Sequence, residues 1–169
     1  MALGDRAAVC VMRAGEADLP EILAVQKRAF ASEAERYGDP NLPPLRETLD
    51  EIREQLATHV VLKAVWDCQI VGSVRGHLEA GSCHVTRLAV RPDVQGRGIG
   101  SLLVGALEEQ FPNAESFVLF TGHKSHRTIA LYERLGYRVT HSTVESDRVT
   151  LVHMAKHSGS ERPGAERQG

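Results

Sequence analysis

A glycine-rich segment at residues 91–100, RPDVQGRGIG, is the part of the sequence whose residue types point most directly to chemistry. It joins an apolar run to a stretch with helical apolar spacing. Backbone N–H groups at the start of a helix have no intrahelical partners, and the helix dipole is positive there, so phosphate oxygens can bind them. The glycines at positions 96, 98 and 100 lack the Cβ atoms that would block such an approach. The segment therefore predicts a phosphate-binding connection, with an ordinary glycine-containing turn as the alternative.

Two other phosphate-binding motifs are excluded by the sequence. A nucleoside-triphosphate loop requires Gly-Lys followed by Ser or Thr, and this triplet is absent. A dinucleotide fingerprint requires three glycines in a βαβ unit near the first strand of a domain. Here the glycines follow three consecutive apolar runs, which are typical of an antiparallel meander.

The elements that must position this segment follow from apolar periodicity and turn residues. We expect strands at residues 9–12, 60–66, 69–78, 83–90, 116–121, 137–141 and 148–156. We expect helices from an N-cap at Asp18 to a point before Tyr37, from about Arg46, from the glycine-rich segment to Pro112, and at residues 126–135. Three prolines in residues 37–45 predict an ordered loop. The pattern favours one domain at residues 1–157, with a mobile tail at residues 158–169.

The composition is that of an ordinary globular protein, with 42% hydrophobic and 25% charged residues in 169. A net charge of -2 excludes the basic bias of nucleic-acid binding. Cys10, Cys68 and Cys83 are too far apart for a disulfide framework or a CxxC metal site, and we interpret them as buried or half-buried free thiols. With no signal peptide and no apolar run long enough for a membrane span, we expect a soluble, cytoplasmic protein.

Two segments carry a resemblance to a known family. Residues 87–109, RLAVRPDVQGRGIGSLLVGALEE, resemble motif A of the GNAT superfamily of acetyltransferases, in which Gln95, Gly98 and Gly100 match every fixed position of the pyrophosphate loop. Residues 129–137, IALYERLGY, are similar to motif B at the usual separation. The order of elements extends the likeness over about residues 9–156. The resemblance implies an α/β fold with a mixed, largely antiparallel sheet flanked by helices, and acetyl-CoA as the acyl donor.

The resemblance also implies a cofactor site. The pantetheine arm of CoA would lie along Leu88, Ala89 and Val90 as an added strand, and an N–H group near Val90 would bind the thioester oxygen. The pyrophosphate would bind the loop and the start of the helix, with Arg97 adding positive charge. The loop residues are Gln95, Gly96, Arg97, Gly98, Ile99, Gly100 and Ser101.

Tyr132 stands at the position of the family's general acid. A thiol of pKa roughly 8.5 leaves as a thiolate more easily when a phenol of pKa about 10 donates a proton to it. The alternative is a tyrosine that only fills the apolar face of its helix, and both roles are compatible because a buried phenol still needs a hydrogen-bond partner.

Two positions depart from the family pattern. Many members have Asn seven residues before the motif B tyrosine, where its amide contacts the cofactor arm, and this chain has Ser125. The strand position that carries a glutamate base in some members is His84. An imidazole of pKa about 6.5 is able to take a proton from an ammonium group. Glu79, His123 or water are the alternatives for the base.

These inferences predict an N-acetyltransferase that transfers the acetyl group directly to a primary amine, without a covalent enzyme intermediate. The acceptor would enter over residues 37–45, and its identity stays open. Transfer to a hydroxyl group and assembly as a homodimer stay open as well. A non-catalytic acyl-CoA-binding module is the alternative from another class, and Tyr132 argues against it. No metal is expected, because His153 and His157 lack the glutamate of a zinc-binding HExxH motif.

Overall fold

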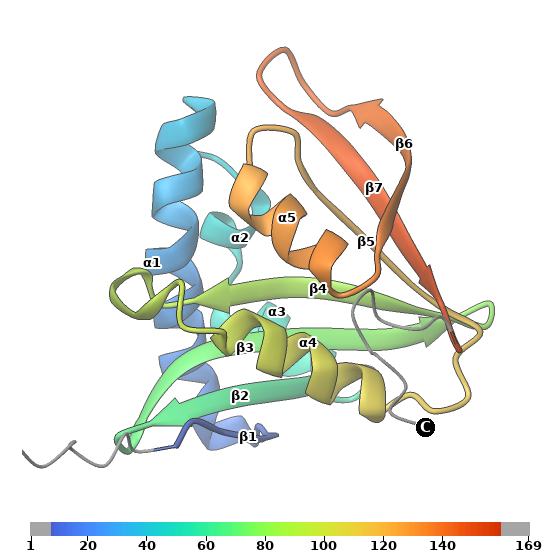
Figure 1. Cartoon of the computed structure of the whole chain (residues 1–169). Helices are drawn as coiled ribbons and strands as arrows, with labels where there is room; N and C mark the ends of the chain where they lie inside the picture. Colours follow the sequence, from blue (N-terminus) through green and yellow to red (C-terminus); the bar gives the residue numbers. More distant parts are fainter. Residues whose placement is uncertain (1–7, 160–169) are drawn as a thin grey trace, which may run out of the picture.

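The computed structural model describes residues 8–159 of the chain. The strands of its sheet are β1 (Cys10–Arg13), β2 (Val60–Trp66), β3 (Gln69–Glu79), β4 (Ser82–Val90), β5 (Ser116–Gly122), β6 (Arg138–Val144) and β7 (Thr150–His157) (Figure 1). The helices are α1 (Leu19–Tyr37), α2 (Pro43–Arg46), α3 (Leu49–Gln55), α4 (Ile99–Glu109) and α5 (His126–Arg134). Short 3-10 turns at Glu16–Asp18 and Pro92–Val94 precede α1 and α4.

The strands form one sheet in the order β1-β2-β3-β4-β5-β7-β6. β4 and β5 pair in parallel, and the other neighbours pair in antiparallel fashion. The meander of β2, β3 and β4 is the one that the three consecutive apolar runs predict. The prediction of a mixed, largely antiparallel sheet flanked by helices is therefore confirmed.

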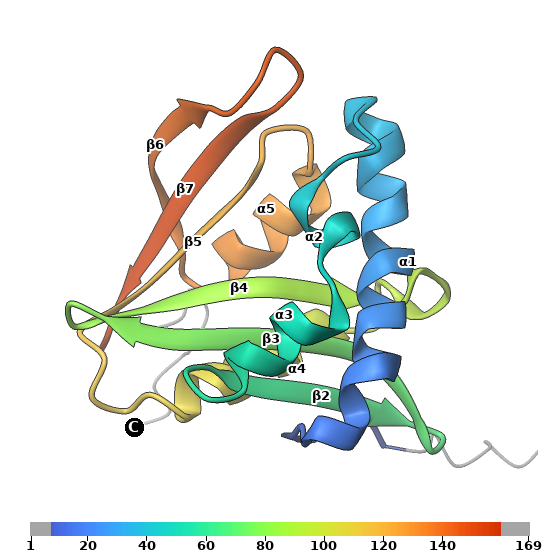
Figure 2. The same cartoon turned by 180° about the vertical axis from the view of Figure 1, so that it is seen from behind.

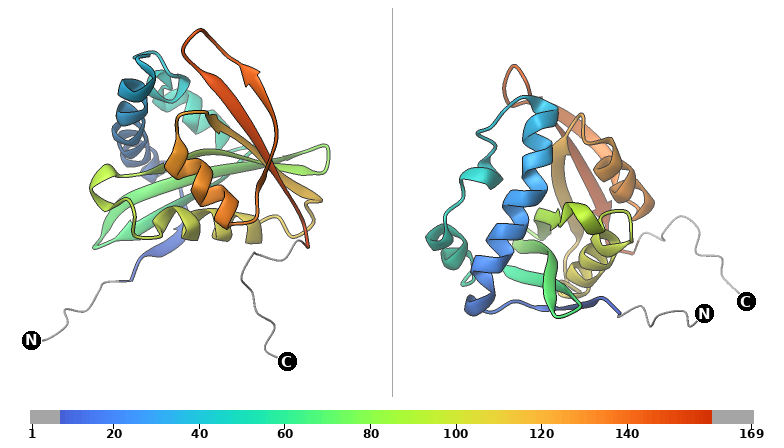
Figure 3. Two further views of the ribbon diagram at one scale, coloured as in Figure 1. Left: turned by 45° about the horizontal axis from the view of Figure 1, so that its top comes forward. Right: turned by 90° about the vertical axis from the view of Figure 1, so that its left-hand side faces the viewer.

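Helices cover both faces of this sheet. α4 and α5 lie on the face toward the viewer in Figure 1, whereas α1, α2 and α3 lie on the opposite face in Figure 2. The side view in Figure 3 shows α3 and α4 on opposite sides of the strands. A residue on a central strand therefore faces one helical layer or the other according to its parity along the strand.

Two glycines of β3 bring α4 close to the sheet. A Cβ added at Gly72 would lie 3.0 Å from Leu103, and one added at Gly76 would lie 3.0 Å from Leu107. Both leucines are fully buried in the main apolar cluster. A second, smaller cluster under α1 and α3 includes the fully buried Ile52. The sheet thus lies between two apolar layers, and close packing at the two glycines fixes the distance between α4 and β3.

Several predicted boundaries are wrong by a few residues. α1 includes Tyr37 rather than ending before it, and the predicted loop at residues 37–45 contains most of the short helix α2. The next helix begins at Leu49 rather than near Arg46, because the Thr48 side chain accepts a hydrogen bond from the Glu51 N–H and caps it. β7 begins two residues after the predicted start at residue 148.

Two interpretations of single side chains are also corrected. Asp18 makes no capping hydrogen bond within α1, and instead its carboxylate accepts from the Gly15 N–H and from Lys63. Cys83 is buried, but Cys10 and Cys68 are exposed thiols. Within residues 8–159, no helix combines the length and hydropathy that a membrane crossing requires. Most of the tail predicted to be mobile, residues 160–169, lies outside the described residues.

Candidate functional site

The strands β4 and β5 separate partway along their length. Their parallel register covers Ser82–Ser116, Cys83–Phe117 and His84–Val118, after which β5 continues to Gly122 beside β7 alone. Within residues 8–159, residues 85–90 of β4 therefore have β3 on one edge and no strand partner on the other. A free strand edge of this kind can bind an extended ligand through main-chain hydrogen bonds.

A bulge reverses the parity of β4 where the two strands separate. Arg87 has a φ of +53°, which is uncommon for a residue with a side chain, and the register with β3 shifts beside it. Before the bulge, Cys83 and Val85 pack in the cluster under α4. After it, Leu88 and Val90 lie 3.9 and 4.0 Å from the Cβ position of Gly100. The bulge thus turns the side chains of Leu88 and Val90, two of the three residues predicted to lie along the pantetheine arm, toward the start of α4.

The glycine-rich loop ends in an open helix start. Gly96 and Gly98 have φ values of +78° and +84°, a conformation that side chains disfavour. A Cβ on Gly98 would meet no atom of the described residues within 4 Å. The Gln95 amide nitrogen donates to the Val90 carbonyl at 2.9 Å, which anchors the loop to the end of β4. These glycines leave the N–H groups at the start of α4 open to an anion.

The next residues combine packing with a possible backbone role. The Ile99 side chain is buried against Gly72, so only the main chain of Ile99 can reach a ligand. A Cβ on Gly100 would lie 3.2 Å from Leu131 of α5, so this glycine allows close packing of two helices. Ser101 is half-buried in the first turn of α4. The packing role of Gly100 is a reason for glycine that the sequence interpretation did not include.

Two arginines lie at the loop, Arg97 within it and Arg127 on α5. The Arg97 guanidinium lies 5.1 Å from the centre of the Trp66 ring, a cation–π contact. Arg127 Nη2 lies 3.3 Å from the Cβ position of Gly96. Arg127 was missed in the sequence interpretation. Its signal is a cation in the first turn of α5, where the dipole disfavours positive charge unless an anion is near.

Tyr132 of α5 is buried on the α4 side of the sheet. Its ring packs edge-on against Tyr137, with ring centres 5.4 Å apart. Among residues 8–159 its hydroxyl has no hydrogen-bond partner. Burial raises the pKa of this phenol above its usual value, so the proton stays on the oxygen at neutral pH. The residue is therefore a buried, protonated donor without an acceptor in the described part of the chain.

His84 lies on the opposite face of the sheet from Tyr132. It pairs with His77 of β3, whose neighbour Arg75 points toward α1 and α3. The His84 ring is stacked on the His77 ring at 4.9 Å, and its Nε2 lies 3.8 Å from a carboxylate oxygen of Glu79. Its side chain is 39% exposed, so the imidazole is accessible from solvent. His84 stands at the last register pair before β4 and β5 separate.

Ser125, the predicted cofactor contact, belongs to a directional hydrogen-bond chain. The Lys124 N–H donates to the Tyr37 hydroxyl at 2.9 Å, and the Tyr37 and Ser125 oxygens are 2.8 Å apart. Ser125 donates to Glu33 at 2.6 Å. Because Ser125 has a single hydroxyl proton, Tyr37 must donate to it. These hydrogen bonds join the end of α1 to the connection between β5 and α5, and the Ser125 side chain that they include is buried.

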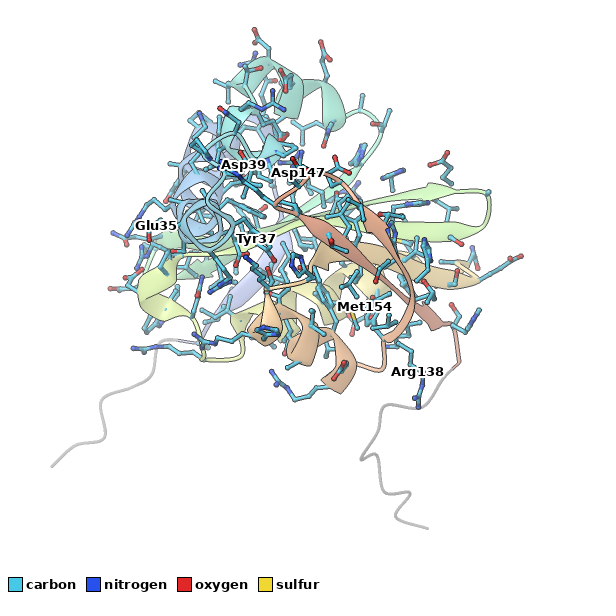
Figure 4. The ribbon with its side chains drawn as sticks, turned by 90° about the horizontal axis from the view of Figure 1, so that it is seen from above. Glu35, Tyr37, Asp39, Arg138, Asp147 and Met154 are labelled. Carbon is cyan, nitrogen blue, oxygen red and sulfur yellow. The ribbon has the colours of Figure 1, made fainter. Side chains whose placement is uncertain are left out.

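A second contact closes the same end of the molecule. The Arg148 guanidinium donates to the Gly38 carbonyl, which joins the connection between β6 and β7 to the end of α1. Figure 4 looks onto this end and shows Asp39 next to Asp147, with Tyr37 pointing inward from α1. The start of the predicted acceptor loop is thus held from two directions.

A buried polar network lies under α1, α2 and α3. Arg75 and Glu47 form a two-point ion pair, with N–O distances of 2.6 and 3.0 Å. Gln26 and Gln55 each accept from Arg75 at 2.6 Å, and Arg87 of the β4 bulge donates to Glu47 at 3.1 Å. Burial alone would raise the pKa of the Glu47 carboxyl, but the hydrogen bonds and charge of Arg75, with bonds from Gln26 and Arg87, lower it to about 2. Glu47 is therefore ionised and holds Arg87 at the bulge.

A polar pocket of about 320 Å³ opens over this network. Its lining combines basic and acidic side chains with one glutamine and one proline. The lining residues are Pro43, Arg46, Glu47, Glu51, Gln55 and Arg87. The volume is at the lower end of the range of about 300–1,000 Å³ for small-molecule sites. The pocket lies on the face that His84 shares with Arg75, and it includes one residue of the predicted acceptor loop.

Comparisons with known sequences agree with this geometry. The family profile described as "Acetyltransferase (GNAT) domain" matches residues 41–158. The curated UPF0157 protein YqkA of Bacillus subtilis (strain 168) is 25% identical over 118 residues, which are 70% of this chain and 34% of that protein. The chain thus spans about a third of the length of that relative.

Solved structures share the fold at low sequence identity. The ribosomal-protein-S18-alanine N-acetyltransferase from Escherichia coli is 16% identical, with a TM-score of 0.73 over 96% of this chain and 99% of that one. The PaiA N-acetyltransferase from Thermoplasma acidophilum in complex with coenzyme A is 16% identical, with a TM-score of 0.68 over 89% and 99% of the two chains. The ribosomal-protein-alanine N-acetyltransferase from Brucella melitensis is 20% identical, with a TM-score of 0.70 over 88% and 99%. At these identities the likeness shows the fold alone.

Proposed function

The chain belongs to the GNAT acetyltransferase family, and from this premise we propose that it transfers an acetyl group from acetyl-CoA to a primary amine. The observation that carries the proposal is the open helix start at Gly98, which stands beside the free edge of β4. A pyrophosphate and an extended pantetheine arm together require these two features side by side.

The donor site fits acetyl-CoA residue by residue. In the proposed complex, Gln95, Gly96, Arg97, Gly98, Ile99, Gly100 and Ser101 bind the pyrophosphate, mainly through main-chain N–H groups. Arg127 adds positive charge near Gly96, because its guanidinium lies within contact distance of that residue. Leu88, Ala89 and Val90 lie along the pantetheine arm. Ser125 can donate to the arm only if its bond to Glu33 rearranges, because its single hydroxyl proton is engaged there and one of its two lone pairs accepts from Tyr37.

Tyr132 serves as the general acid in this proposal. Acetyl-CoA supplies an activated thioester, and the sulfur must gain a proton as it departs. The Tyr132 hydroxyl retains its proton at neutral pH and has no competing acceptor among residues 8–159. A free donor at this point protonates the sulfur without first breaking a bond to the protein.

The acceptor binds on the other face of the sheet. We assign the pocket lined by Arg46, Glu51 and Arg87 to it, since these charges suit a polar amine that also carries an anionic group. His84 on the same face takes a proton from the ammonium group of the acceptor, directly or through water, and this gives the neutral amine that attacks the thioester. The acid and the base then act from opposite faces of the sheet, and the amine meets the thioester in the opening between β4 and β5.

The test is a transfer assay with acetyl-CoA and a panel of polar amines. The proposal expects CoA release that depends on the amine, together with a mass increase of one acetyl group on the acceptor. The variant Tyr132→Phe should keep CoA affinity and lose about 10²–10⁴-fold in kcat, because it keeps the packed ring and removes the acid. Cys10 and Cys68 are exposed and react with thiol reagents, so CoA should be separated from the protein before it is counted.

The rival function gives the opposite result. An acyl-CoA-binding module would bind acetyl-CoA tightly and release no CoA with any amine on a broad panel. A matched control is Tyr137→Phe, which changes the neighbouring ring in the same way. Its hydroxyl already donates to Glu108, so this variant should retain turnover. Equal losses in the two variants would mean that packing, and not proton donation, explains the effect.

A further inference from the structure

The hairpin of β3 and β4 brings His77, Glu79 and His84 together. His77 and Glu79 are two residues apart on β3 and so share a face, and His84 pairs directly with His77 across the hairpin. Nε2 of His77 lies 3.6 Å from Oε2 of Glu79, and Nε2 of His84 lies 3.8 Å from the same oxygen. One ligand atom from each residue lies within 4.8 Å of the others.

These separations are close to those of metal ligands. In a tetrahedral zinc site with metal–ligand distances of about 2.0–2.2 Å, neighbouring ligand atoms are about 3.3–3.6 Å apart. The two histidine–carboxylate separations of 3.6 and 3.8 Å need only a small side-chain adjustment to reach this range. Both Nε2 atoms lie within 3.8 Å of the same carboxylate oxygen, and the stacked rings, with planes 17° apart, must rotate for their lone pairs to meet at one ion.

We propose that His77, Glu79 and His84 bind one divalent transition-metal ion of the zinc class, with water completing its coordination. Two imidazoles and a carboxylate suit Zn²⁺, Co²⁺ or Ni²⁺, whereas Mg²⁺ and Ca²⁺ prefer oxygen ligands alone. The three side chains are 27%, 69% and 39% exposed, so an ion enters directly from solvent. Nothing in the transferase reaction itself requires this ion.

The backbone holds the three ligands in place before any ion binds. Ala80 and Gly81 form a two-residue hairpin turn with φ values of +49° and +84°, and Glu79 pairs with Ser82 beside it. On the β2 side, the ring of His59 packs against His77 at 4.4 Å and restricts its rotation. A site on two paired strands pays little ordering entropy when the ion binds.

The site has a consequence for the proposed transferase, and this step rests on the proposed function. The Nε2 lone pair of His84 that would bind the ion is the same lone pair that would accept the proton of the amine. A bound Zn²⁺ therefore removes the base, and acetyl transfer should slow when the site is filled. Glu79 links the two roles, because it is a ligand of the ion and a neighbour of the base.

Metal binding is tested first, without acetyl-CoA. The full-length chain is freed of metal with a chelator and titrated with Zn²⁺ by calorimetry and with Co²⁺ by visible absorption. We expect one ion per chain and the intense visible bands of four-coordinate Co²⁺. Glu79→Gln and His84→Gln should each weaken binding at least about tenfold, the loss that even outer-shell substitutions typically cause. The exposed side chain of Glu79 makes its variant the one that leaves the fold intact.

The control is His141→Gln at the other stacked histidine pair, His141 and His153, whose ring centres are 4.2 Å apart. This variant should bind Zn²⁺ like the wild type. Equal binding by wild type, Glu79→Gln and His84→Gln would overturn the proposal, as would a sulfur-to-cobalt charge-transfer band, which would place the ion at a cysteine. The transfer assay is then repeated with Zn²⁺. Binding without inhibition would leave the metal site in place and exclude His84 as the base.

Discussion

Arg75 and Glu47 form a two-point ion pair in which the side chains are only 1% and 4% exposed. The folded protein lowers the pKa of the Glu47 carboxyl from 4.5 to about 2. A depressed folded-state pKa contributes stability above the unfolded value, and this contribution is lost as the pH falls through the folded value. We expect Glu47 to contribute roughly 3 kcal/mol to the free energy of unfolding near neutral pH, and to lose it between about pH 4.5 and 2.

Glu47→Gln separates this contribution from those of other carboxylates. Urea unfolding across the acid range should show a difference of about 3 kcal/mol between wild type and variant near neutral pH. The two curves should converge toward pH 2. Glu51→Gln, an exposed residue at the same pocket, should run parallel to the wild type throughout. A constant offset between wild type and Glu47→Gln at every pH would contradict the assignment.

Gly98 is the loop position at which we expect a substitution to weaken CoA binding most. With a φ of +84° and open space at its Cβ position, a side chain there costs backbone strain and occupies the place of a phosphate oxygen. Gly98→Val should therefore weaken CoA binding at least about tenfold in calorimetry, which corresponds to about 1.4 kcal/mol. Gly81→Val carries comparable strain at the opposite end of β4 and should leave CoA affinity unchanged. An unaltered affinity in Gly98→Val would remove the loop from the proposed site.

Substitution should identify the base among the four candidates, which are His84, Glu79, His123 and water. His84→Gln is expected to lower kcat about 10²–10⁴-fold with little change in the KM for acetyl-CoA. His123→Gln tests the imidazole at the end of β5, whose Nδ1 is bonded to the main chain of Thr150, so that its Nε2 would have to accept the proton. Glu79→Gln tests the remaining side chain. If His123→Gln gave the largest loss, the base would lie at the end of β5, and if none of the three lowered kcat, water would serve.

The sequence predicted what depends on local pattern. Periodicity placed the three strands of the meander and the helix after the glycine-rich loop, because each signal lies within a dozen residues. The cap at Thr48 is also local and was overlooked, which moved the start of α3 by three residues. Of the candidate site, the sequence located the loop and the tyrosine helix through the family resemblance, while Arg127 carried only a weak dipole signal.

Contacts between distant segments could not be predicted from the sequence. Glu47 and Arg75 are separated by 28 positions, and Ser125 lies 88 positions from Tyr37. No periodicity links such pairs, since each forms only when two elements pack. The group of His77, Glu79 and His84 is intermediate between features that follow from a local pattern and contacts between distant segments. Its H-x-E pattern, followed by a histidine across a tight turn, is readable once the hairpin register is assigned.

The Tyr37 ring of α1 packs directly against the backbone of Gly122 in β5. A Cβ on Gly122 would lie 2.1 Å from the Tyr37 hydroxyl oxygen and 2.5 Å from the ring carbon that carries it. Gly122→Ala must therefore displace the buried ring or the strand, at a cost of about 1–3 kcal/mol. Displacing the ring also breaks the hydrogen bonds of Tyr37 to Ser125 and Lys124, so the connection leading into α5 should loosen.

A double-mutant cycle in urea unfolding checks this relationship. Tyr37→Ala alone should cost about 3–5 kcal/mol, because it removes a buried aromatic ring. In the pair Tyr37→Ala and Gly122→Ala the clash no longer exists, so the combined cost should fall short of the sum by about 1–2 kcal/mol. If the two costs were additive, β5 itself would move to accommodate the methyl group. The Tyr37 ring would then not be what fixes the distance between α1 and the connection that carries Ser125.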